Sequence, residues 1–472
     1  MNYLVIDLTH GGVKISISLA KKGKNVFAYD IYNTLKGIDE KMLEIYGVEI
    51  INLGDLDNLK GDLKVIYPIH LPLTLDEIKS YNPNLNYTFT THHEAISEIL
   101  DGWGKDIPKI EITGVKGKTS CAFMLKEILI DENPLILSSL GALLYENKKE
   151  IKLRKNISIT PANIKETIDL AYKFTNPTCQ IKDGNVKKEK KRKYSCAIFE
   201  SSLGASGIGD VGLLTNIVED YPIANNKSKA SKAKEQIFRC ETVVCQKESL
   251  DKYYSHIKHE KINSFSITDK KANLYLANAE YSLDKTKITI EYRDVKTKKG
   301  NVISGNLIVE TFAPGRHHVS NVLGVILVCL SLEINHEKII KGLENYKGIT
   351  GRTNKKVIEN STIIEEINPG INTESIKESI NMIKDLDNYM IAIGGDYGIT
   401  CEEIDEKRVS LFLDTLNYDL ILTGDVGNSI AKKMKSKVKY IADYTEIYEI
   451  AIKENKNLLF IYRSSYSKLS QR

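Results

Sequence analysis

The chain has 472 residues, and its length and composition already exclude some classes of protein. A prior of about 150 residues per domain predicts about three domains, each with its own hydrophobic core. Lys and Arg number 66 and Asp and Glu 62, so the formal net charge is only +4. Nucleic-acid-binding proteins need a concentrated basic field, so we expect no nucleic acid among the partners.

Neither a targeting peptide nor a membrane-spanning segment is expected. Asp7 lies inside the first apolar stretch and no basic stretch precedes it, which is unlike a signal peptide. The stretch Val322 to Leu332 is about half as long as a bilayer requires, so it is interpreted as a buried helix. Without a membrane-spanning segment, no membrane partner is expected. Seven cysteines without C-x-x-C spacing predict reduced thiols and a cytoplasmic protein. They are Cys121, Cys179, Cys196, Cys240, Cys245, Cys329 and Cys401.

The first hundred residues alternate between strand-like and helix-like patterns. An apolar run at residues 3–7 precedes a helix-like stretch that ends at Lys22, and a second strand is expected from Asn25 to Asp30. Gly11 and Gly12, after the first strand, lack the rest of the dinucleotide-binding fingerprint. They are interpreted as a tight turn, with cofactor binding as the alternative.

A new strand pattern starts at Ile107 and leads into the most specific motif of the sequence. The expected strand Lys109 to Thr113 is followed by a Gly-rich turn and a helix from Ser120 to Ile130. Glycines in this context let backbone N–H groups surround phosphate oxygens at a helix N-terminus. We predict nucleotide binding, with Lys118 on the β- and γ-phosphates and Thr119 on Mg²⁺. The predicted contacts here are Thr113, Gly114, Val115, Lys116, Gly117, Lys118, Thr119 and Ser120.

A third pattern follows Gly351-Arg352. Strands are expected at Val357–Ile358, Thr362–Glu366, Tyr389–Ile393 and Leu420–Leu422. The last two end in Gly-Asp turns, which indicates a parallel sheet with ligands at its carboxyl edge.

The sequence Thr-Gly-x-x-Gly-Lys-Thr after a short strand resembles the ATP loop of the Mur ligases, and later segments follow in that family's order. Glu200, in Glu-Ser-Ser, corresponds to a magnesium ligand of the family. Lys234, in Ala-Lys-Glu-Gln-Ile-Phe, corresponds to a lysine that relatives carbamylate to make a metal ligand. Residues 215–221, Thr-Asn-Ile-Val-Glu-Asp-Tyr, resemble the family's Thr-Asn-x-x-x-Asp-His segment. Tyr221 stands where the family usually has a metal-binding His, which leaves a second magnesium site open.

Two further segments match the family's nucleotide-binding positions. His317 and Asn321 match a segment that faces the adenine, although His318 replaces an Asn there. Arg352 resembles the Arg that opens the C-terminal domain, and its planar fork suits a phosphate. Glu366 is interpreted as a ribose contact.

The resemblance implies an α/β fold with the three-domain Mur-ligase-like architecture. The implied domains are a Rossmann-like substrate domain at 1–104, a central P-loop ATP-binding domain at 105–347 and a Rossmann-like ligase domain at 348–472. It also implies an ATP-dependent ligase that activates a substrate carboxylate as an acyl phosphate, with ATP and Mg²⁺ as cofactors. The implied metal ligands are Thr119 and Glu200, and the implied catalytic residues are Lys118, Lys234 and Arg352.

Three segments, at residues 9–12, 200–212 and 365–372, look most like the coenzyme F430 synthetase branch of this family. That likeness implies a small-molecule substrate, a nickel tetrapyrrole carboxylate, whose last carbocycle is closed with release of ADP and phosphate. Nickel is then expected only as part of the substrate. Thr160 and His10 are the candidate substrate contacts. The histidines of the N-terminal region are interpreted as structural, with nickel ligation as the alternative; they are His10, His70, His92 and His93.

Two alternatives stay open at the level of sequence. One is a Mur-type amide-forming ligase that joins an amino acid to a carboxylate, of the cell-wall or polyglutamate kind. The other is a nucleotide-binding regulatory protein without ligase activity, suggested by Tyr221 and His318.

Overall fold

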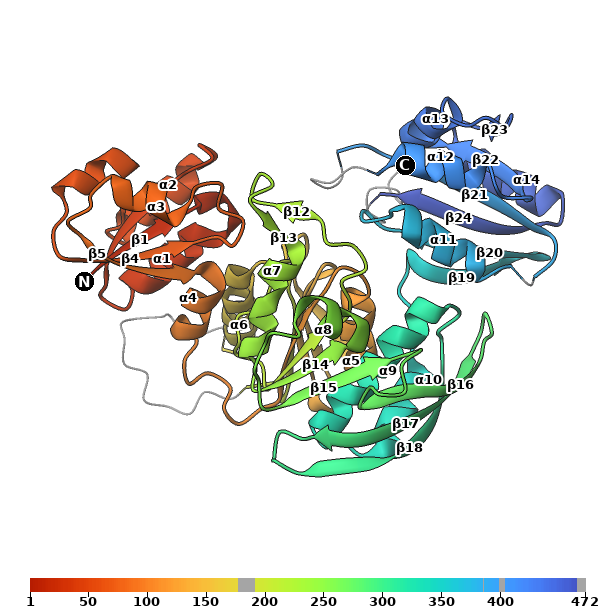
Figure 1. The fold of residues 1–472 in the computed structure, drawn as a ribbon, viewed down its shortest axis with the longest axis horizontal. Helices are drawn as coiled ribbons and strands as arrows, with labels where there is room; N and C mark the ends of the chain where they lie inside the picture. The colour runs from red at the N-terminus through yellow and green to blue at the C-terminus, as the bar shows by residue number, and fades with distance from the viewer. Residues whose placement is uncertain (177–191, 385, 399–403, 465–472) are drawn as a thin grey trace. The chain divides into compact units, whose positions relative to one another are not determined.

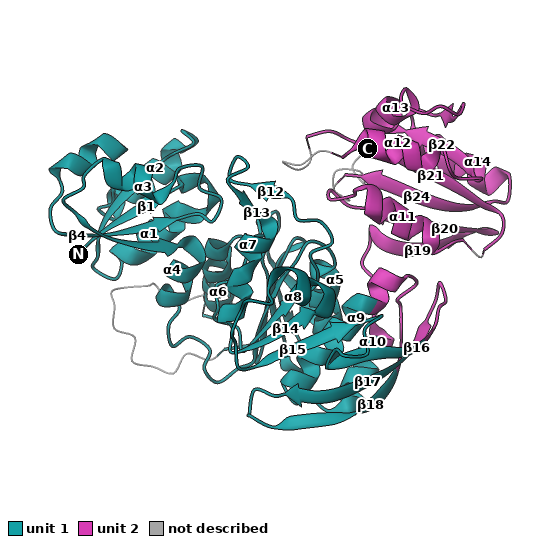
Figure 2. Ribbon diagram, in the orientation of Figure 1, with its two compact units in different colours: residues 1–278, 289–308, 320–343 teal, residues 279–288, 309–319, 344–472 magenta. Residues whose placement is uncertain are grey.

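The computed structural model describes residues 1–176, 192–384, 386–398 and 404–464, and it has an α/β fold (Figure 1). The chain folds into two compact units (Figure 2). Unit 1 comprises Met1–Asn278, Thr289–Ile308 and Ser320–Leu343. Unit 2 comprises Ala279–Ile288, Val309–Val319 and Glu344–Arg472. The bounds of the three predicted domains stay a prediction.

The N-terminal part of unit 1 is a parallel sheet with helices, as the alternation of patterns predicts. Its strand order is β3-β2-β1-β4-β5, with β1 at the centre. Its strands are β1 (Asn2–Ile6), β2 (Asn25–Tyr29), β3 (Glu49–Ile50), β4 (Asp62–Tyr67) and β5 (Asn86–Thr91). Its helices are α1 (Val13–Ala20), α2 (Gly37–Ile45), α3 (Leu75–Ser80) and α4 (His92–Ile99).

A larger sheet follows, ordered β18-β17-β16-β15-β14-β11-β6-β10-β7-β8-β9. The strands β6, β10 and β11 lie side by side in parallel and are wholly buried, as expected for apolar strands covered on both faces. The strands are β6 (Lys109–Thr113), β7 (Leu135–Ser138), β8 (Gly141–Glu146), β9 (Lys149–Arg154), β10 (Ala197–Glu200), β11 (Val211–Leu214), β14 (Thr242–Gln246), β15 (Ile262–Ser266), β16 (Leu274–Glu280), β17 (Thr286–Lys296) and β18 (Val302–Thr311). The helices and the small hairpin here are α5 (Lys118–Ile128), α6 (Pro161–Thr175), β12 (Pro222–Ile223), β13 (Ser228–Lys229), α7 (Ala230–Lys234), α8 (Lys247–Tyr253), α9 (Arg316–Ser331) and α10 (His336–Asn345).

The C-terminal sheet has the order β19-β20-β24-β21-β22-β23. All its neighbouring strands are parallel except β19 and β20, whose antiparallel pairing corrects the expectation of a wholly parallel sheet. Only two residues join these strands, and Glu359 among them has φ 53°, so the connection is a tight hairpin that cannot join parallel strands. The strands are β19 (Arg352–Ile358), β20 (Ser361–Ile367), β21 (Tyr389–Gly395), β22 (Asp419–Thr423), β23 (Lys439–Tyr440) and β24 (Asn457–Arg463). The helices are α11 (Thr373–Asn381), α12 (Glu406–Leu413), α13 (Gly424–Ala431) and α14 (Tyr444–Lys453).

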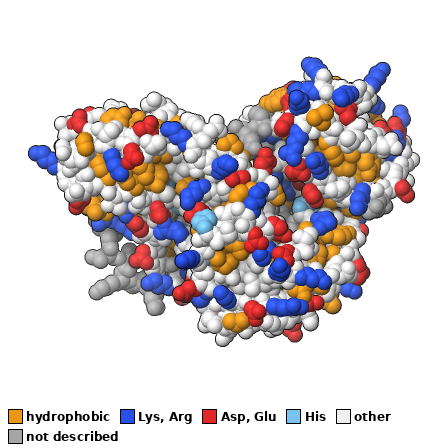
Figure 3. Space-filling view, in the orientation of Figure 1, with side chains coloured by type: hydrophobic (Ala, Val, Ile, Leu, Met, Phe, Trp, Pro, Cys, Tyr) orange, Lys and Arg blue, Asp and Glu red, His pale blue; other side chains and the backbone are white. Residues whose placement is uncertain are grey.

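The apolar stretch after Val322 lies in α9 and is buried through Leu330, as predicted. Among the described residues, no helix has the length and apolar character that crossing a membrane requires. Five cysteines are buried and form no disulfide, whereas Cys179 and Cys401 lie outside the described residues. Figure 3 shows acidic and basic side chains interspersed over the visible face.

Candidate nucleotide-binding and ligase site

The predicted phosphate loop lies between β6 and α5, in unit 1. The strand ends at Thr113, and α5 begins at Lys118, two residues before the predicted start. The two loop glycines have left-handed backbone angles, with φ 141° at Gly114 and φ 84° at Gly117. The loop therefore leads directly into a helix N-terminus, where aligned peptide dipoles favour an anion.

Both glycines are required by space as well as by backbone angle. A Cβ atom on Gly114 would lie 2.0 Å from Thr215 Oγ1, and one on Gly117 would lie 2.1 Å from Asn321 Oδ1. Asn321 is buried in α9, so the structure brings this predicted adenine-facing residue against the phosphate loop. A loop without side chains at these points forms the close-fitting cradle that phosphate oxygens need.

Residues about a hundred positions later in the chain hold the loop in shape. Thr215 Oγ1 donates a hydrogen bond to the Lys116 carbonyl oxygen at 2.6 Å. The Lys116 N–H donates to Asn216 Oδ1 at 3.1 Å, and the Val115 N–H donates to the Asn216 carbonyl oxygen at 2.9 Å. The sequence suggested this Thr-Asn segment only through its family likeness, and its bracing role was not predicted.

The predicted magnesium ligands lie together at the end of β10. Thr119 Oγ1 donates to both carboxylate oxygens of Glu200 at 3.0 Å, and Glu200 is buried. Ser139, which sequence reasoning missed, adds its hydroxyl 3.0 Å from Thr119 Oγ1 and its N–H 3.0 Å from Glu200 Oε2. Hydroxyl and carboxylate oxygens are the donors that Mg²⁺ prefers, so this set fits that ion.

Lys234 is fully buried at the end of α7 and donates a hydrogen bond from Nζ to the Ser202 carbonyl oxygen at 2.5 Å. Burial lowers the pKa of Lys234 well below its ordinary value, and the nearby charge of Lys118 lowers it further. Its Nζ lies 5.9 Å from the centre of the Tyr221 ring, the residue that replaces the family's metal-binding His. A lysine with a lowered pKa has the neutral amine that reaction with carbon dioxide requires.

A buried carboxylate at the middle of β6 organises the Gly-rich segment that follows Glu200. Glu111 is fully buried and accepts hydrogen bonds from the N–H groups of residues 206–209 and from the Ser206 hydroxyl, at 2.6 to 3.2 Å. Burial raises the pKa of Glu111. No sequence pattern indicated this role, apart from the presence of a charged residue inside an apolar strand.

Three predicted nucleotide contacts lie in unit 2. Arg352 opens β19, and His317 lies near the start of α9, with Nδ1 3.7 Å from Glu378 Oε2. Glu366, in β20, is buried, and burial raises its pKa. Its role as a ribose contact, like the roles of the other two residues, stays a prediction.

Residues of unit 2 also form a chain of hydrogen bonds that the sequence did not suggest. His318 is partly buried, and its Nε2 lies 2.9 Å from Thr353 Oγ1, which donates in turn to Glu366. His318, the departure from the family's Asn, thus helps to fix the Glu366 carboxylate. Burial lowers the pKa of His318 well below its ordinary value.

The two predicted substrate contacts lie near each other in unit 1. Thr160 precedes α6, and His10 belongs to the turn Leu8–Gly12 after β1. A Cβ atom on Gly11 would lie 2.5 Å from Ala162 Cβ and 3.8 Å from Thr160 Oγ1, so this turn packs against the start of α6. Hydrogen bonding to Asp7 raises the pKa of His10.

The α/β fold of this chain, with its loop between β6 and α5, is similar to that of solved Mur ligases. The MurF ligase of Thermotoga maritima, solved in complex with ADP, matches with a TM-score of 0.55 and 13% identity, over 86% of this chain and 92% of that one. The predicted likeness to the Mur ligase family is confirmed.

The predicted likeness to the coenzyme F430 synthetase branch is confirmed as well. Residues 355–465 match the family model described as the C-terminal domain of coenzyme F430 synthetase CfbE. The protein named coenzyme F430 synthetase in Methanocaldococcus jannaschii is 27% identical over 94% of this chain and 95% of its own. The protein of that name in Methanosarcina acetivorans is 26% identical over 92% of both chains. The likeness to these relatives supports the prediction that this chain is an ATP-dependent ligase.

Proposed function

We propose that this protein is an ATP-dependent ligase that makes coenzyme F430 by closing its final carbocyclic ring. ATP phosphorylates a propionate side chain of the nickel seco precursor, giving an acyl phosphate and ADP. A carbon of the same macrocycle loses a proton and attacks the acyl carbon, the bond to phosphate breaks, and a cyclic ketone forms. Nickel enters only as part of the substrate.

The observation that supports carboxylate activation most directly is the group of oxygens beside the phosphate loop. Thr119 and Glu200 would hold Mg²⁺, which supplies positive charge for the phosphoryl group when it is bound. Lys118, at the N-terminus of α5, and Arg352 are the cations that we assign to the same task. Phosphoryl transfer depends mainly on such positioning and charge, so this set suits it.

Once the carboxyl group is activated, ring closure needs mainly that the protein hold the substrate in the right conformation. The nucleophilic carbon and the activated carboxyl belong to one molecule, and well-oriented intramolecular attack reaches effective molarities of about 10⁵ to 10⁸ M. The names of the relatives that match nearly the whole chain support this reaction over amide formation. Amide formation by a Mur-type ligase remains the second candidate, since the MurF neighbour shares the fold.

The proposal is tested by the dependence of ADP release on the nickel seco precursor. Wild-type protein is expected to release ADP only when the precursor is present, and Lys118→Ala is expected to lower that rate by about 10² or more. Lys126→Ala on the same helix is the control, because Lys126 pairs with Glu127 away from the loop. Precursor-independent ADP release, or equal rates in both variants, would contradict the proposal.

A further inference from the structure

Three side chains meet at the carboxyl end of the N-terminal sheet. Asp7 and His10 follow β1, and His70 follows β4, the strand beside β1. The order β3-β2-β1-β4-β5 places the reversal of strand order between these two strands. Doubly wound α/β sheets bind their ligands at this switch point, outside the carboxyl ends of the strands.

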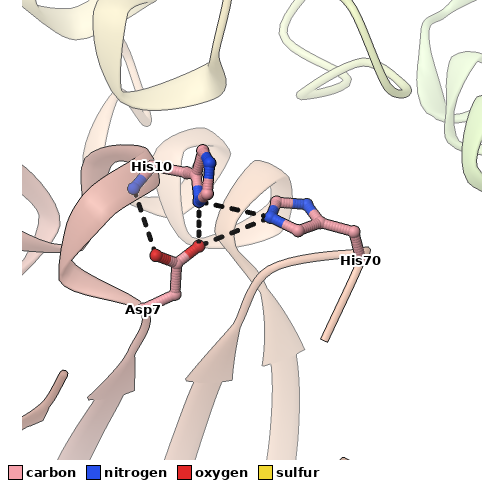
Figure 4. Close-up of side chains that lie close together, drawn as sticks. All are labelled: Asp7, His10 and His70. Atoms are coloured by element: carbon pink, nitrogen blue, oxygen red, sulfur yellow. Dashed lines mark hydrogen bonds and ion pairs between the residues drawn. The ribbon is translucent and has the colours of Figure 1, made fainter. Parts of the chain in front are cut away.

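The three side chains direct one ligand-type atom each toward a common point (Figure 4). His10 Nδ1 lies 2.8 Å from Asp7 Oδ2, and His70 Nε2 lies 3.5 Å from the same oxygen. The two ring nitrogens lie 3.3 Å apart. Each atom therefore faces the other two.

Hydrogen bonds to Asp7 explain two of the three contacts but not the close approach of the two ring nitrogens. A ring nitrogen carries either one hydrogen or one lone pair in the ring plane. If both rings donate to Asp7 Oδ2, two N–H groups lie side by side with their nitrogens 3.3 Å apart, and that contact between the rings is not stabilised by a hydrogen bond. If His10 Nδ1 instead accepts from His70, its lone pair faces the Asp7 oxygen at 2.8 Å.

A metal ion satisfies all three atoms at once. Ligands about 2.1 Å from a tetrahedral ion lie about 3.4 Å from one another, close to the spacing of these three atoms. Two imidazoles and one carboxylate suit zinc and its transition-metal neighbours, whereas Mg²⁺ and Ca²⁺ prefer all-oxygen sites.

The local backbone fixes the carboxylate for this purpose. Asp7 is fully buried and has φ 74°, a left-handed conformation that is unusual outside glycine. Its Oδ1 accepts hydrogen bonds from the Thr9 and His10 N–H groups at 3.0 and 3.1 Å. Oδ2 is thereby directed to the two histidines.

We propose that Asp7, His10 and His70 form a binding site for a divalent transition-metal ion, of which Zn²⁺ is the model. Three protein ligands leave a coordination position open. The His10 side chain is 44% exposed and that of His70 25%, so solvent reaches these two residues and can supply a further oxygen ligand. The site replaces the structural role that the sequence predicted for these histidines, and it does not depend on the proposed ligase reaction.

The test is zinc binding to the full-length chain, freed of metal by a chelator, without an affinity tag and in excess Mg²⁺. We expect one Zn²⁺ per chain by calorimetry, with an X-ray absorption signature of two imidazole ligands. His70→Gln should weaken binding by about tenfold or more and leave one imidazole. Asp7→Asn should weaken it similarly, because Asn tolerates the left-handed conformation but lacks the charge.

His256→Gln is the matched control, since this exposed histidine lies outside the cluster. Its zinc affinity should equal that of the wild type. Absence of a 1:1 site in the wild type would overturn the proposal, as would equal affinity in His70→Gln and wild type. If Asp7→Asn does not fold, the difference in zinc affinity between His70→Gln and His256→Gln still tests the proposal. Product formation from ATP and the nickel precursor is measured separately, so failure of either proposal is seen on its own.

Discussion

At the residue scale, the shape of the predicted phosphate loop depends on two glycines and on residues far away in the sequence that pack against them. Thr215 and Asn321 occupy the space where side chains at Gly114 and Gly117 would lie. A methyl group at either position meets both a strained backbone and a steric clash. The backbone strain and the steric clash can be measured separately, because Gly23 is also left-handed but has no atom near its Cβ position.

Gly117→Ala is expected to lower both stability and ATP affinity. The left-handed conformation costs a non-glycine residue about 1–2 kcal/mol, and Asn321 must move in addition. Gly23→Ala, with φ 73° and no atom within 4 Å of its Cβ, carries the strain without the clash. Thermal unfolding and ATP titration of both variants measure the difference. Equal ATP affinity in the two variants would contradict the assigned role of the loop.

Lys234 is expected to carry a carbamate when the protein is supplied with bicarbonate. Burial lowers its pKa well below the ordinary value, which favours the neutral amine that reacts with carbon dioxide. Carbon-13 bicarbonate should give a carbamate signal in the NMR spectrum of the wild type and none in Lys234→Ala. Lys232→Ala, at an exposed position of α7, should keep the signal. A signal that survives in Lys234→Ala would assign the carbamate elsewhere.

At the scale of elements, β6 provides two separate anchors. Its carboxyl end leads into the phosphate loop, and Glu111 within it holds residues 206–209. The strand therefore positions both the predicted phosphate loop and the Gly-rich segment after Glu200.

Glu111→Gln is expected to destabilise the protein by about 1–3 kcal/mol, because an amide NH₂ would face backbone N–H donors. Glu127→Gln, on α5, removes only a partly exposed pair with Lys126, worth less than about 1 kcal/mol. Denaturant unfolding of both variants checks the prediction. A Glu111→Gln variant as stable as Glu127→Gln would show that the anchor contributes little.

Helix α4 begins with two buried histidines that make stability depend on pH. Burial lowers the pKa of His92 to about 4 and that of His93 to about 3. Below the ordinary pKa of 6.5 the unfolded chain binds protons that the folded chain does not, so stability falls as pH falls. Between pH 7 and 5 the loss is about 2 kcal/mol for each histidine.

His93→Phe is expected to reduce that loss by about 2 kcal/mol, since both His93 ring nitrogens lack a hydrogen-bond partner among the described residues. The free energy of unfolding at pH 7 and pH 5 gives the comparison. The same loss in wild type and variant would mean that His93 is not neutral in the folded protein.

At the scale of the whole molecule, the sequence predicted what is local and periodic. The strand–loop–helix unit around Lys118 and the buried helix after Val322 were found because their patterns lie in one continuous stretch. The bracing of the loop by Asn216 and the meeting of Asp7 with His70 depend on which strands become neighbours. Single-sequence patterns do not fix such long-range pairing, so these features needed the structure.

The antiparallel direction of β19 was also not predictable from the sequence pattern alone. Whether two strands run parallel depends on the connection between them. The positive φ of Glu359, which is typical of a tight turn, is seen only in the structure. The identity of the acceptor is likewise not written in the phosphate loop. The proposed acceptor rests on likeness over nearly the whole chain.

The central claim is ring closure, and the mass of the product tests it most directly. The protein is incubated with the nickel seco precursor, ATP and Mg²⁺ in the absence of any amine. We predict a product lighter than the precursor by one water, with one ADP and one phosphate released for each product. An unchanged precursor, or a product that forms only when an amino acid is supplied and is heavier by its residue, would contradict ring closure.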